Sequence, residues 1–308
     1  MTTAFAHIGL FYRDRKDFLE GTIGYIKAGL SAGEPVMAVV PTDNLKLLRE
    51  ELRDVRGGSS VVTQDMTVAG RNPGRILPGV LLAFAAAHPG RRVRIIGEPI
   101  WAGRGPVEYP ACVQHEALIN SAFAGRNAGI LCPYDVSQLA SEVVRDARRT
   151  HPILQTWEGR SASPDYADPA QVAGDFNQPL PPRPERAQVL GIGPSDLPGL
   201  RRFVGAQGAQ AGLSGSRIAD LTLAVNELAT NSIVHAGGAG TLAIWSDNGQ
   251  VVCEIADGGH LADPLVGRLP APVDQPGGRG LVLVQHLCDL VRVYTRPGAT
   301  TIRIHIGR

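Results

Sequence analysis

Along the first half of the chain, short apolar runs take turns with longer segments in which apolar residues recur every three or four positions. Short apolar runs at 7–12, 35–41, 60–65, 92–99 and 128–135 are typical of buried strands. Between and after them, the segments 15–33, 43–55, 74–88, 113–124 and 137–150 show helical spacing. Strands that alternate with helices predict a parallel sheet with helices on its faces, so we expect an α/β domain over residues 1–158.

The second half follows a different order. Two helices are predicted at 195–212 and 214–235, followed by a hairpin over 241–257 that turns at Asn248-Gly249. A glycine-led helix at 277–289 and a final hairpin over 291–307 complete the pattern. We expect a second α/β domain over residues 187–308, because a chain of 308 residues exceeds the usual size of one core.

The segment between these halves has a different composition. Residues 159–186 are rich in Pro, Ser, Ala and Asp and lack periodicity, and "PLPPRPE" should be extended and stiff. We expect an interdomain linker, since a structureless loop of this length is uncommon inside a compact domain. The alternative is a long ordered loop wrapped on one domain.

Composition and charge exclude several classes of protein. The net charge of +1 argues against a broad nucleic-acid surface, and no apolar run is long enough to cross a bilayer. The chain shows no signal-peptide pattern, and its four cysteines form no CxxC pair. We expect a cytoplasmic protein with reduced cysteines, no zinc or redox motif, and no direct contact with nucleic acid or membrane.

The first domain lacks the motifs of a nucleotide site. The run after 7–12 is "RDRKDFLEG", which contains neither GxxxxGK[ST] nor GxGxxG. The carboxyl ends of the strands remain the expected ligand edge of such a sheet.

Five short motifs follow one another in this domain: "NPGRI", "GEPIWAGR", "QHEALIN", "CPYD" and "DARRTHP". With them, residues 5–155 resemble the MEDS domain, a sensory module named from methanogens and methylotrophs. The resemblance implies a RecA-like fold without a phosphate loop and a sensory role, with a small molecule or a partner as its signal.

Several polar residues lie where a sensory pocket is expected. Glu98 and Trp101 follow the strand at 92–99, and the further candidates are Arg104, His115, Glu116 and Tyr134. Alternatively, Glu98 pairs with an arginine and Trp101 packs as a lid on the sheet edge. His115-Glu116 has no second histidine three or four residues away, so we expect no metal site there.

The helix at 214–235 carries two stripes. Its apolar stripe is Leu221, Val225, Leu228 and Ser232. Its polar stripe is Glu227, Asn231 and His235, which recur every fourth residue and therefore point in similar directions.

The motifs "NELATNSIVHAGG", "ADGG" and "GGRGLVLVQHLCD" stand in this order over residues 187–308. This arrangement resembles the Bergerat-fold (GHKL) ATPases, and among them the small anti-sigma-factor serine/threonine kinases. The resemblance implies a two-layer α/β sandwich that binds ATP and Mg²⁺. The motif after Asp257 departs from the family's D-x-G-x-G, because here it reads "DGGHL".

The resemblance also implies roles for individual residues. Asn231 would offer its amide oxygen to Mg²⁺, and Glu227 would orient or deprotonate the attacking hydroxyl. Asp257, which precedes Gly258 and Gly259, would accept a hydrogen bond from the adenine amino group. An anion site would form at the start of a helix from Gly277, Gly278, Arg279, Gly280 and Leu281. His235 would approach the phosphates or fix the helix end.

Three functions from different classes fit these features. In the first, the protein is a regulator that binds a sigma factor and phosphorylates a Ser/Thr of an anti-sigma antagonist protein, acting as a homodimer. In the second, it is a sensor histidine kinase, but a Pro-rich segment stands where the phosphoacceptor hairpin is needed. In the third, it is a non-catalytic module whose partner affinity depends on ATP.

Overall fold

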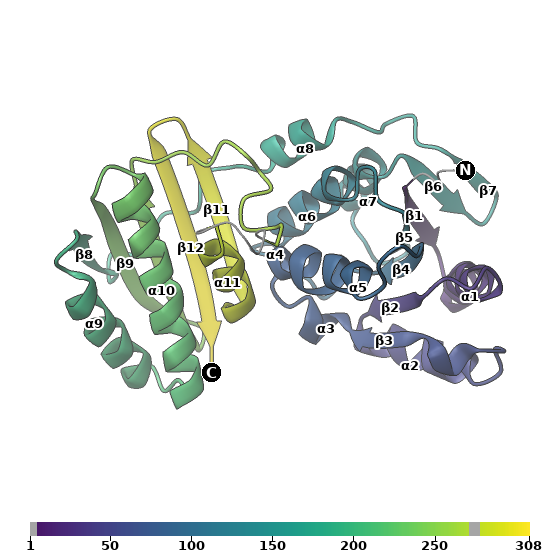
Figure 1. The fold of residues 1–308 in the computed structure, drawn as a ribbon, viewed down its shortest axis with the longest axis horizontal. Helices are drawn as coiled ribbons and strands as arrows, with labels where there is room; N and C mark the ends of the chain where they lie inside the picture. Colours follow the sequence, from purple (N-terminus) through teal and green to yellow (C-terminus); the bar gives the residue numbers. More distant parts are fainter. Residues whose placement is uncertain (1–4, 271–277) are drawn as a thin grey trace. The chain divides into compact units, whose positions relative to one another are not determined.

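The computed structural model describes residues 5–270 and 278–308. The chain divides into two compact units, Met1–Phe176 and Asn177–Arg308. Both units combine helices with a sheet (Figure 1), which confirms the predicted α/β class with two domains.

Unit 1 is built on one sheet in the order β3-β2-β4-β5-β1-β6-β7. Its strands are β1 (Ala6–Tyr12), β2 (Val36–Val40), β3 (Val62–Asp65), β4 (Val93–Gly97), β5 (Ala128–Asp135), β6 (Ile153–Thr156) and β7 (Gly159–Ala162). The five predicted strands, β1 to β5, pair in parallel, as predicted. β6 adds a sixth parallel strand beside β1, and β7 pairs antiparallel with β6 at the edge.

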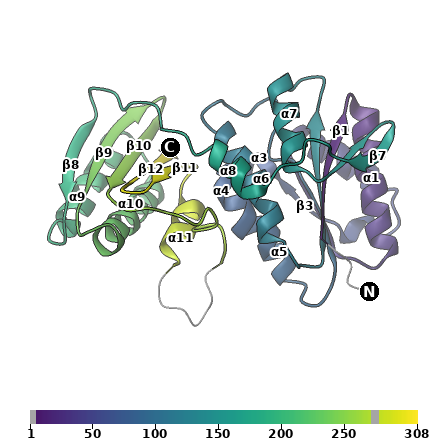
Figure 2. The ribbon, with the colours of Figure 1, turned by 90° about the horizontal axis from the view of Figure 1, so that it is seen from above.

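Helices cover both faces of this sheet (Figure 2). They are α1 (Arg15–Ser31), α2 (Thr42–Leu52), α3 (Met66–Ala69), α4 (Pro73–Ile76), α5 (Leu82–Ala86), α6 (Tyr109–Ala122), α7 (Ser141–Thr150) and α8 (Pro169–Asp175), with single turns η1 (Gly58–Ser60) and η2 (Leu77–Leu81). On one face, Ile8 and Leu10 of β1 pack against apolar residues of α1 and α2. On the other face, α6 packs with α7 and α8, and His7 and Cys132 point toward it.

The segment 159–186 is more ordered than an extended linker. It contains β7 and α8, and Val172 and Ala173 of α8 are buried. Beyond the division at Phe176, the side chain of Asn177 exchanges two hydrogen bonds with the backbone of Thr295 in unit 2. The first part of the segment is therefore attached to unit 1 by apolar contacts, and the part after Phe176 is attached to unit 2 by hydrogen bonds. The periodicity of the sequence did not reveal these contacts.

Unit 2 is a two-layer structure in which three helices lie on one face of a five-stranded antiparallel sheet (Figure 2). The strands stand in the order β11-β12-β10-β9-β8. The elements are β8 (Gln188–Ile192), α9 (Leu197–Gln210), α10 (Gly215–His235), β9 (Gly240–Asp247), β10 (Gln250–Asp257), α11 (Gly280–Leu287), β11 (Leu290–Arg296) and β12 (Ala299–Gly307). Asn248 and Gly249, with φ of 46° and 78°, form the predicted tight turn between β9 and β10.

The core of unit 2 lies between its helices and its sheet. Leu221, Val225 and Leu228 of α10 belong to it, which confirms the predicted apolar stripe. On the opposite face of the sheet, Arg303 lies over the ring of Trp245 and donates to the carbonyl of Pro181. This contact holds the Pro-rich segment against the sheet.

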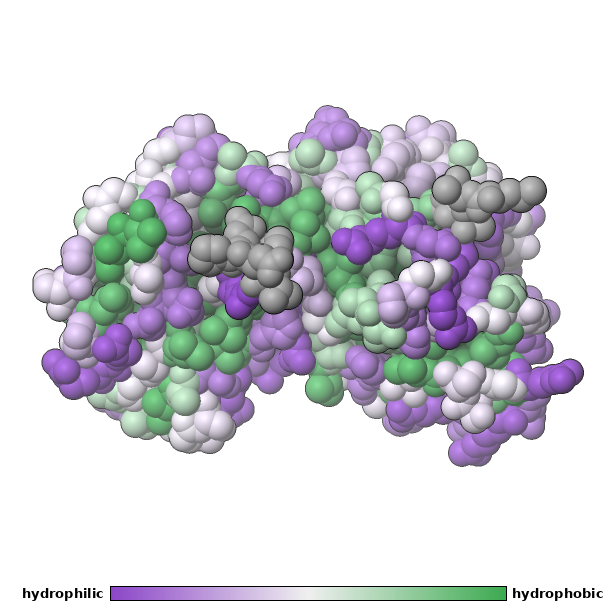
Figure 3. Space-filling model, viewed as in Figure 1, coloured by the Kyte–Doolittle hydropathy of each residue, from purple (hydrophilic) through white to green (hydrophobic). Residues whose placement is uncertain are grey.

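The surface is mixed in character. Hydrophilic and hydrophobic residues are interspersed on the face that Figure 3 shows. Among the described residues, no helix combines the length and the apolar character that a membrane crossing needs.

Candidate functional site

The helix α10 presents its polar stripe beside a cavity in unit 2. Ser214 caps the helix by accepting a hydrogen bond from the backbone of Arg217. Because the apolar stripe is fixed in the core, the offset stripe of Glu227, Asn231 and His235 is held at the border of the helix layer. Glu227 and Asn231 are half-buried, and His235 is exposed.

The first residue of α11 lies directly against this polar stripe. A Cβ atom at Gly280 would stand 2.8 Å from Oε2 of Glu227 and 3.6 Å from Nδ2 of Asn231. Only glycine lets the backbone of the α11 N-terminus come this close to both side chains. The amide N–H groups of a helix start attract anions, so a carboxylate, an amide and an anion-binding backbone converge here.

Asp257, at the end of β10, is oriented by two hydrogen bonds. Ser232 of α10 donates to its Oδ2 at 2.5 Å, and the backbone of Gly259 donates to its Oδ1 at 2.9 Å. The carbonyl of Gly259 accepts from the buried hydroxyl of Thr300 on β12 at 3.1 Å. The carboxylate therefore has a defined direction on the floor of the cavity.

These groups surround a cavity of about 350 Å³. Its lining residues are Leu228, Asn231, His235, Ala236, Ile255, Asp257, Gly259, His260, Leu261, Val266, Gly278, Gly280, Leu281, Thr300 and Ile302. Apolar walls, one carboxylate and a glycine-formed helix start suit a purine base at one end and phosphates at the other. The residues present therefore fit a nucleoside triphosphate.

The structure brings most of the predicted nucleotide residues together. Glu227 lies beside the lining at Gly280, and Arg279 is exposed next to it. Gly277 lies outside the described residues. Sequence reasoning missed two contributors: Ser232, assigned only to the apolar stripe, and Thr300. The four-residue spacing from Leu228 to Ser232 signals shared burial, but pairing with Asp257 depends on a contact across 25 residues.

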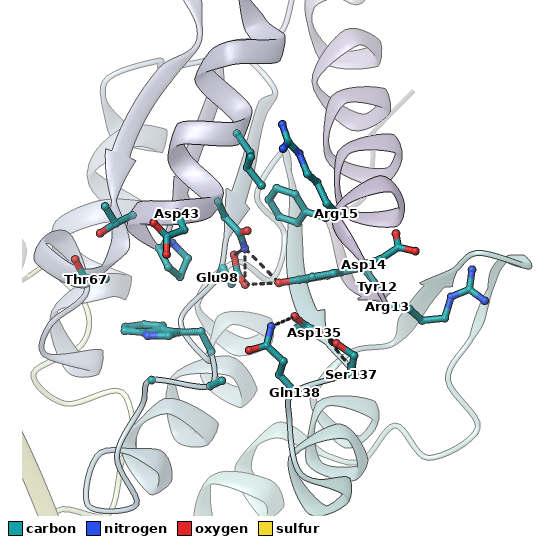
Figure 4. Close-up of a pocket in the computed structure, with 18 residues that line it drawn as sticks. Tyr12, Arg13, Asp14, Arg15, Asp43, Thr67, Glu98, Asp135, Ser137 and Gln138 are labelled. Atoms are coloured by element: carbon teal, nitrogen blue, oxygen red, sulfur yellow. Dashed lines mark hydrogen bonds between the residues drawn. The ribbon is translucent and has the colours of Figure 1, made fainter.

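Unit 1 contains a second cavity, of about 510 Å³, at the carboxyl ends of its parallel strands. Figure 4 shows polar side chains from several elements around it, among them Glu98, Asp135 and Gln138. This is the edge at which the sheet topology predicted a ligand site.

Glu98, after β4, is the buried polar centre of this cavity. It is 1% exposed and accepts hydrogen bonds from Tyr12 at 3.0 Å and from Asn44 at 2.8 Å (Figure 4). Burial raises the pKa of Glu98 to about 8, although both hydrogen bonds oppose the shift. The alternative, in which Glu98 pairs with an arginine, is wrong, because the groups that bond its carboxylate are a hydroxyl and an amide.

The other predicted pocket residues occupy three different places. Trp101 lines the cavity, and the guanidinium of Arg104 lies 4.3 Å from the centre of its ring and bonds backbone carbonyls. His115 is buried within α6. Glu116 and Tyr134 lie away from the cavity lining, in a buried region beside His7 and His151.

The comparisons with known proteins agree with this division. The model of the MEDS family (MEthanogen/methylotroph, DcmR Sensory domain) matches residues 6–152. The model of the histidine kinase-like ATPase domain matches residues 193–306. No curated protein sequence matches the chain.

Solved structures that match include a crystal structure of the RsbU and RsbW domains of a Mycobacterium tuberculosis protein. The identity is 20% and the TM-score 0.30, and the match covers 39% of this chain and 33% of that chain. The match thus spans only a third of that chain's length. The two family matches show that this chain carries a MEDS sensory domain followed by a histidine kinase-like ATPase domain, which implies ATP binding.

Proposed function

We propose that the protein is a signal-responsive regulator that binds Mg-ATP in unit 2 and phosphorylates a Ser/Thr of an anti-sigma antagonist protein. The observation that carries this proposal is the close approach of Gly280 to Glu227 and Asn231. It sets a proton acceptor and a metal-ligand amide against the anion-binding start of α11.

Each residue has a chemical task in this proposal. Asn231 supplies an amide oxygen to Mg²⁺, which neutralises phosphate charge when bound. Gly278 and Gly280 offer backbone N–H groups to the phosphates, and Asp257 accepts from the exocyclic amino group of adenine. Ser232 keeps Asp257 oriented for this contact.

The transfer step needs only a base and a positioned acceptor. Glu227 takes the proton of the incoming serine hydroxyl, while the serine oxygen forms a bond to the γ-phosphorus. The bond between that phosphorus and the bridging oxygen of ADP breaks, and ADP leaves with the electron pair. Phosphoserine and ADP are the products.

The organisation of unit 2 favours a protein acceptor over a histidine in cis. Between the Pro-rich segment and α10, the described chain has only β8 and the 14-residue helix α9. A sensor histidine kinase needs a long two-helix hairpin with a phosphoacceptor at this point. The anti-sigma assignment itself rests on the sequence resemblance of the α10, β10 and α11 motifs.

We assign the input to unit 1. The cavity around Glu98 lies at the ligand edge of a sensory-domain sheet, and its lining is rich in both acidic and basic groups. A polar small molecule bound there would change the kinase output through the connecting segment. The sigma factor would be the partner released or held, with the protein acting as a homodimer.

Phosphotransfer tests the proposal. The full chain is incubated with γ-labelled Mg-ATP and purified candidate anti-sigma antagonists, and the labelled amino acid is identified after hydrolysis. We expect acid-stable phosphoserine or phosphothreonine on an antagonist. Glu227→Gln should abolish transfer while retaining ATP binding. Acid-labile phosphohistidine on the chain itself would contradict the proposal, and binding without any transfer would favour the non-catalytic module.

A further inference from the structure

Four side chains capable of binding metal meet inside unit 1. His7 comes from β1, Cys132 from β5, Glu116 from α6, and His151 directly follows α7. All four are 0–1% exposed. Their candidate ligand atoms lie within 4.8 Å of one another.

The separations between these atoms match those of a tetrahedral metal site. Oε2 of Glu116 lies 3.2 Å from Nε2 of His7 and 3.3 Å from Nε2 of His151. Sγ of Cys132 lies 3.4 Å from Nε2 of His7. Tetrahedral coordination by N, O and S at zinc bond lengths places ligand atoms about 3.3–3.6 Å apart.

The hydrogen bonds around both imidazoles orient them for metal binding. The amide nitrogen of Asn120 donates to two backbone carbonyls, so its oxygen must be the atom 3.2 Å from Nδ1 of His7. Nδ1 of His151 lies 2.7 Å from the carbonyl of Ala147. Each Nδ1 therefore carries a hydrogen, and each Nε2 lone pair points at the cluster. Such a second contact is usual for metal-binding histidines.

Without a cation, this arrangement concentrates acceptors at one buried point. Within the described part of the chain, neither oxygen of Glu116 nor Nε2 of His151 has a hydrogen-bond partner of suitable geometry. Burying such groups unsatisfied is costly. A divalent cation would satisfy them together, because one carboxylate and one thiolate balance its two positive charges.

Gly9 provides the space for this arrangement. It stands opposite Cys132 in the β1–β5 register, two residues after His7 and therefore on the same face. A Cβ atom there would lie 3.2 Å from Cγ of His151. The strand thus carries its smallest residue where the imidazole ring packs onto the sheet.

We propose that His7, Glu116, Cys132 and His151 form a closed four-ligand site for a zinc-type divalent cation. Cys132 binds as the thiolate and releases its proton on metal binding. Four protein ligands and complete burial leave no position for a substrate, which is typical of structural zinc sites. The metal would link the two central strands to the helices α6 and α7.

Metal analysis of the full chain without a histidine tag tests the site. Protein expressed with added zinc is dialysed and measured by elemental mass spectrometry. We expect one zinc ion per chain. X-ray absorption at the zinc edge should show one sulfur and three nitrogen or oxygen neighbours. Cobalt added to chelator-treated protein should give tetrahedral visible bands and a thiolate charge-transfer band.

A matched pair of cysteine variants links the metal to the cluster. Cys132→Ser should lose the charge-transfer band and most of the bound zinc. Cys112→Ser, which alters another fully buried cysteine of unit 1, should keep both. Folded wild-type protein without stoichiometric metal, or without sulfur in the zinc shell, would overturn the proposal. Equal zinc content and spectra in the two variants would also overturn it. The absorption measurement needs no variant, so it decides the matter even if Cys132→Ser fails to fold.

Discussion

Ser232 of α10 donates a hydrogen bond of 2.5 Å to Asp257 at the end of β10. The contact joins the helix layer to the sheet beside the cavity, which Asp257 lines. A Cβ atom at Gly240 would lie 3.3 Å from Cβ of Ser232 and 3.5 Å from Cβ of Asp257. One residue of the buried stripe thus orients the carboxylate that we assign to the adenine.

Ser232→Ala removes this hydrogen bond and leaves Asp257 free to rotate. We expect ATP affinity to fall by about tenfold and the free energy of unfolding by about 1–2 kcal/mol. Titration calorimetry and urea unfolding measure the two effects. Thr230→Ala is the control, because its hydroxyl bonds only the carbonyl of Asn226 in the described structure and lies outside the cavity lining. Equal ATP affinity in both variants would contradict the assigned role of Ser232.

Gly280→Ala places a methyl group 2.8 Å from Oε2 of Glu227. The carboxylate must move, so we expect phosphotransfer to fall by about 10–100-fold. Stability should change by less than about 1 kcal/mol, since alanine favours the helix. Gly205→Ala in α9 is the control, because its nearest contact would be an ordinary 3.8 Å. If Gly280→Ala retained full transfer, the close approach would have no catalytic importance.

Glu98 makes unit 1 less stable as the pH rises. Burial raises its pKa from 4.5 to about 8, and the neighbouring polar groups are Tyr12, Asn44 and Asp135. Between these two values the folded state holds a proton that the unfolded state has lost. The contribution of Glu98 to the free energy of unfolding is therefore highest below pH 4.5. It falls by at most about 1.4 kcal/mol per pH unit up to pH 8.

Glu98→Gln should remove this part of the pH dependence, as measured by urea unfolding of unit 1 from pH 5 to pH 8. Glu51→Gln, at an exposed position of α2, should leave it unchanged. Parallel stability curves for wild type and Glu98→Gln would show that Glu98 is already ionised at neutral pH.

The buried pair of Glu254 and Arg303 should stabilise unit 2. Nε of Arg303 lies 3.0 Å from Oε2 of Glu254, and the side chains are 10% and 12% exposed. Glu254→Gln leaves the guanidinium without its counter-charge, and we expect a loss of about 3 kcal/mol in urea unfolding. Asp247→Asn, which breaks the exposed pair with Arg186, should cost less than about 0.5 kcal/mol. Similar losses in the two variants would contradict the importance of burial here.

Local patterns predicted much of this structure. The run "AGILCPYD" coincides with β5, and the helix predicted at 214–235 is α10 with Ser214 as its cap. Three short strands, β6, β7 and β8, were not predicted, because exposed or half-polar edge strands carry little periodicity.

The sites show the same limit. The stripe of Glu227 and Asn231 is visible in sequence because four-residue spacing fixes a helix face. The cluster of His7 and Glu116 is not, because its ligands lie more than 100 residues apart and meet only through the sheet register. Local spacing argued against a metal site at His115-Glu116, because no second histidine lies three or four residues away. It could not reveal that Glu116 meets His7 and His151, which are distant in the sequence.

The most direct test of the nucleotide site is ATP binding measured by titration calorimetry with and without Mg²⁺. We predict that Mg²⁺ tightens ATP binding to the wild-type chain and that Asn231→Ala removes this difference while the fold remains intact. Asn226→Ala, on the same helix but bonded to Arg201 at the surface, should behave as wild type. Absence of ATP binding, or an unchanged effect of Mg²⁺ in Asn231→Ala, would contradict the account.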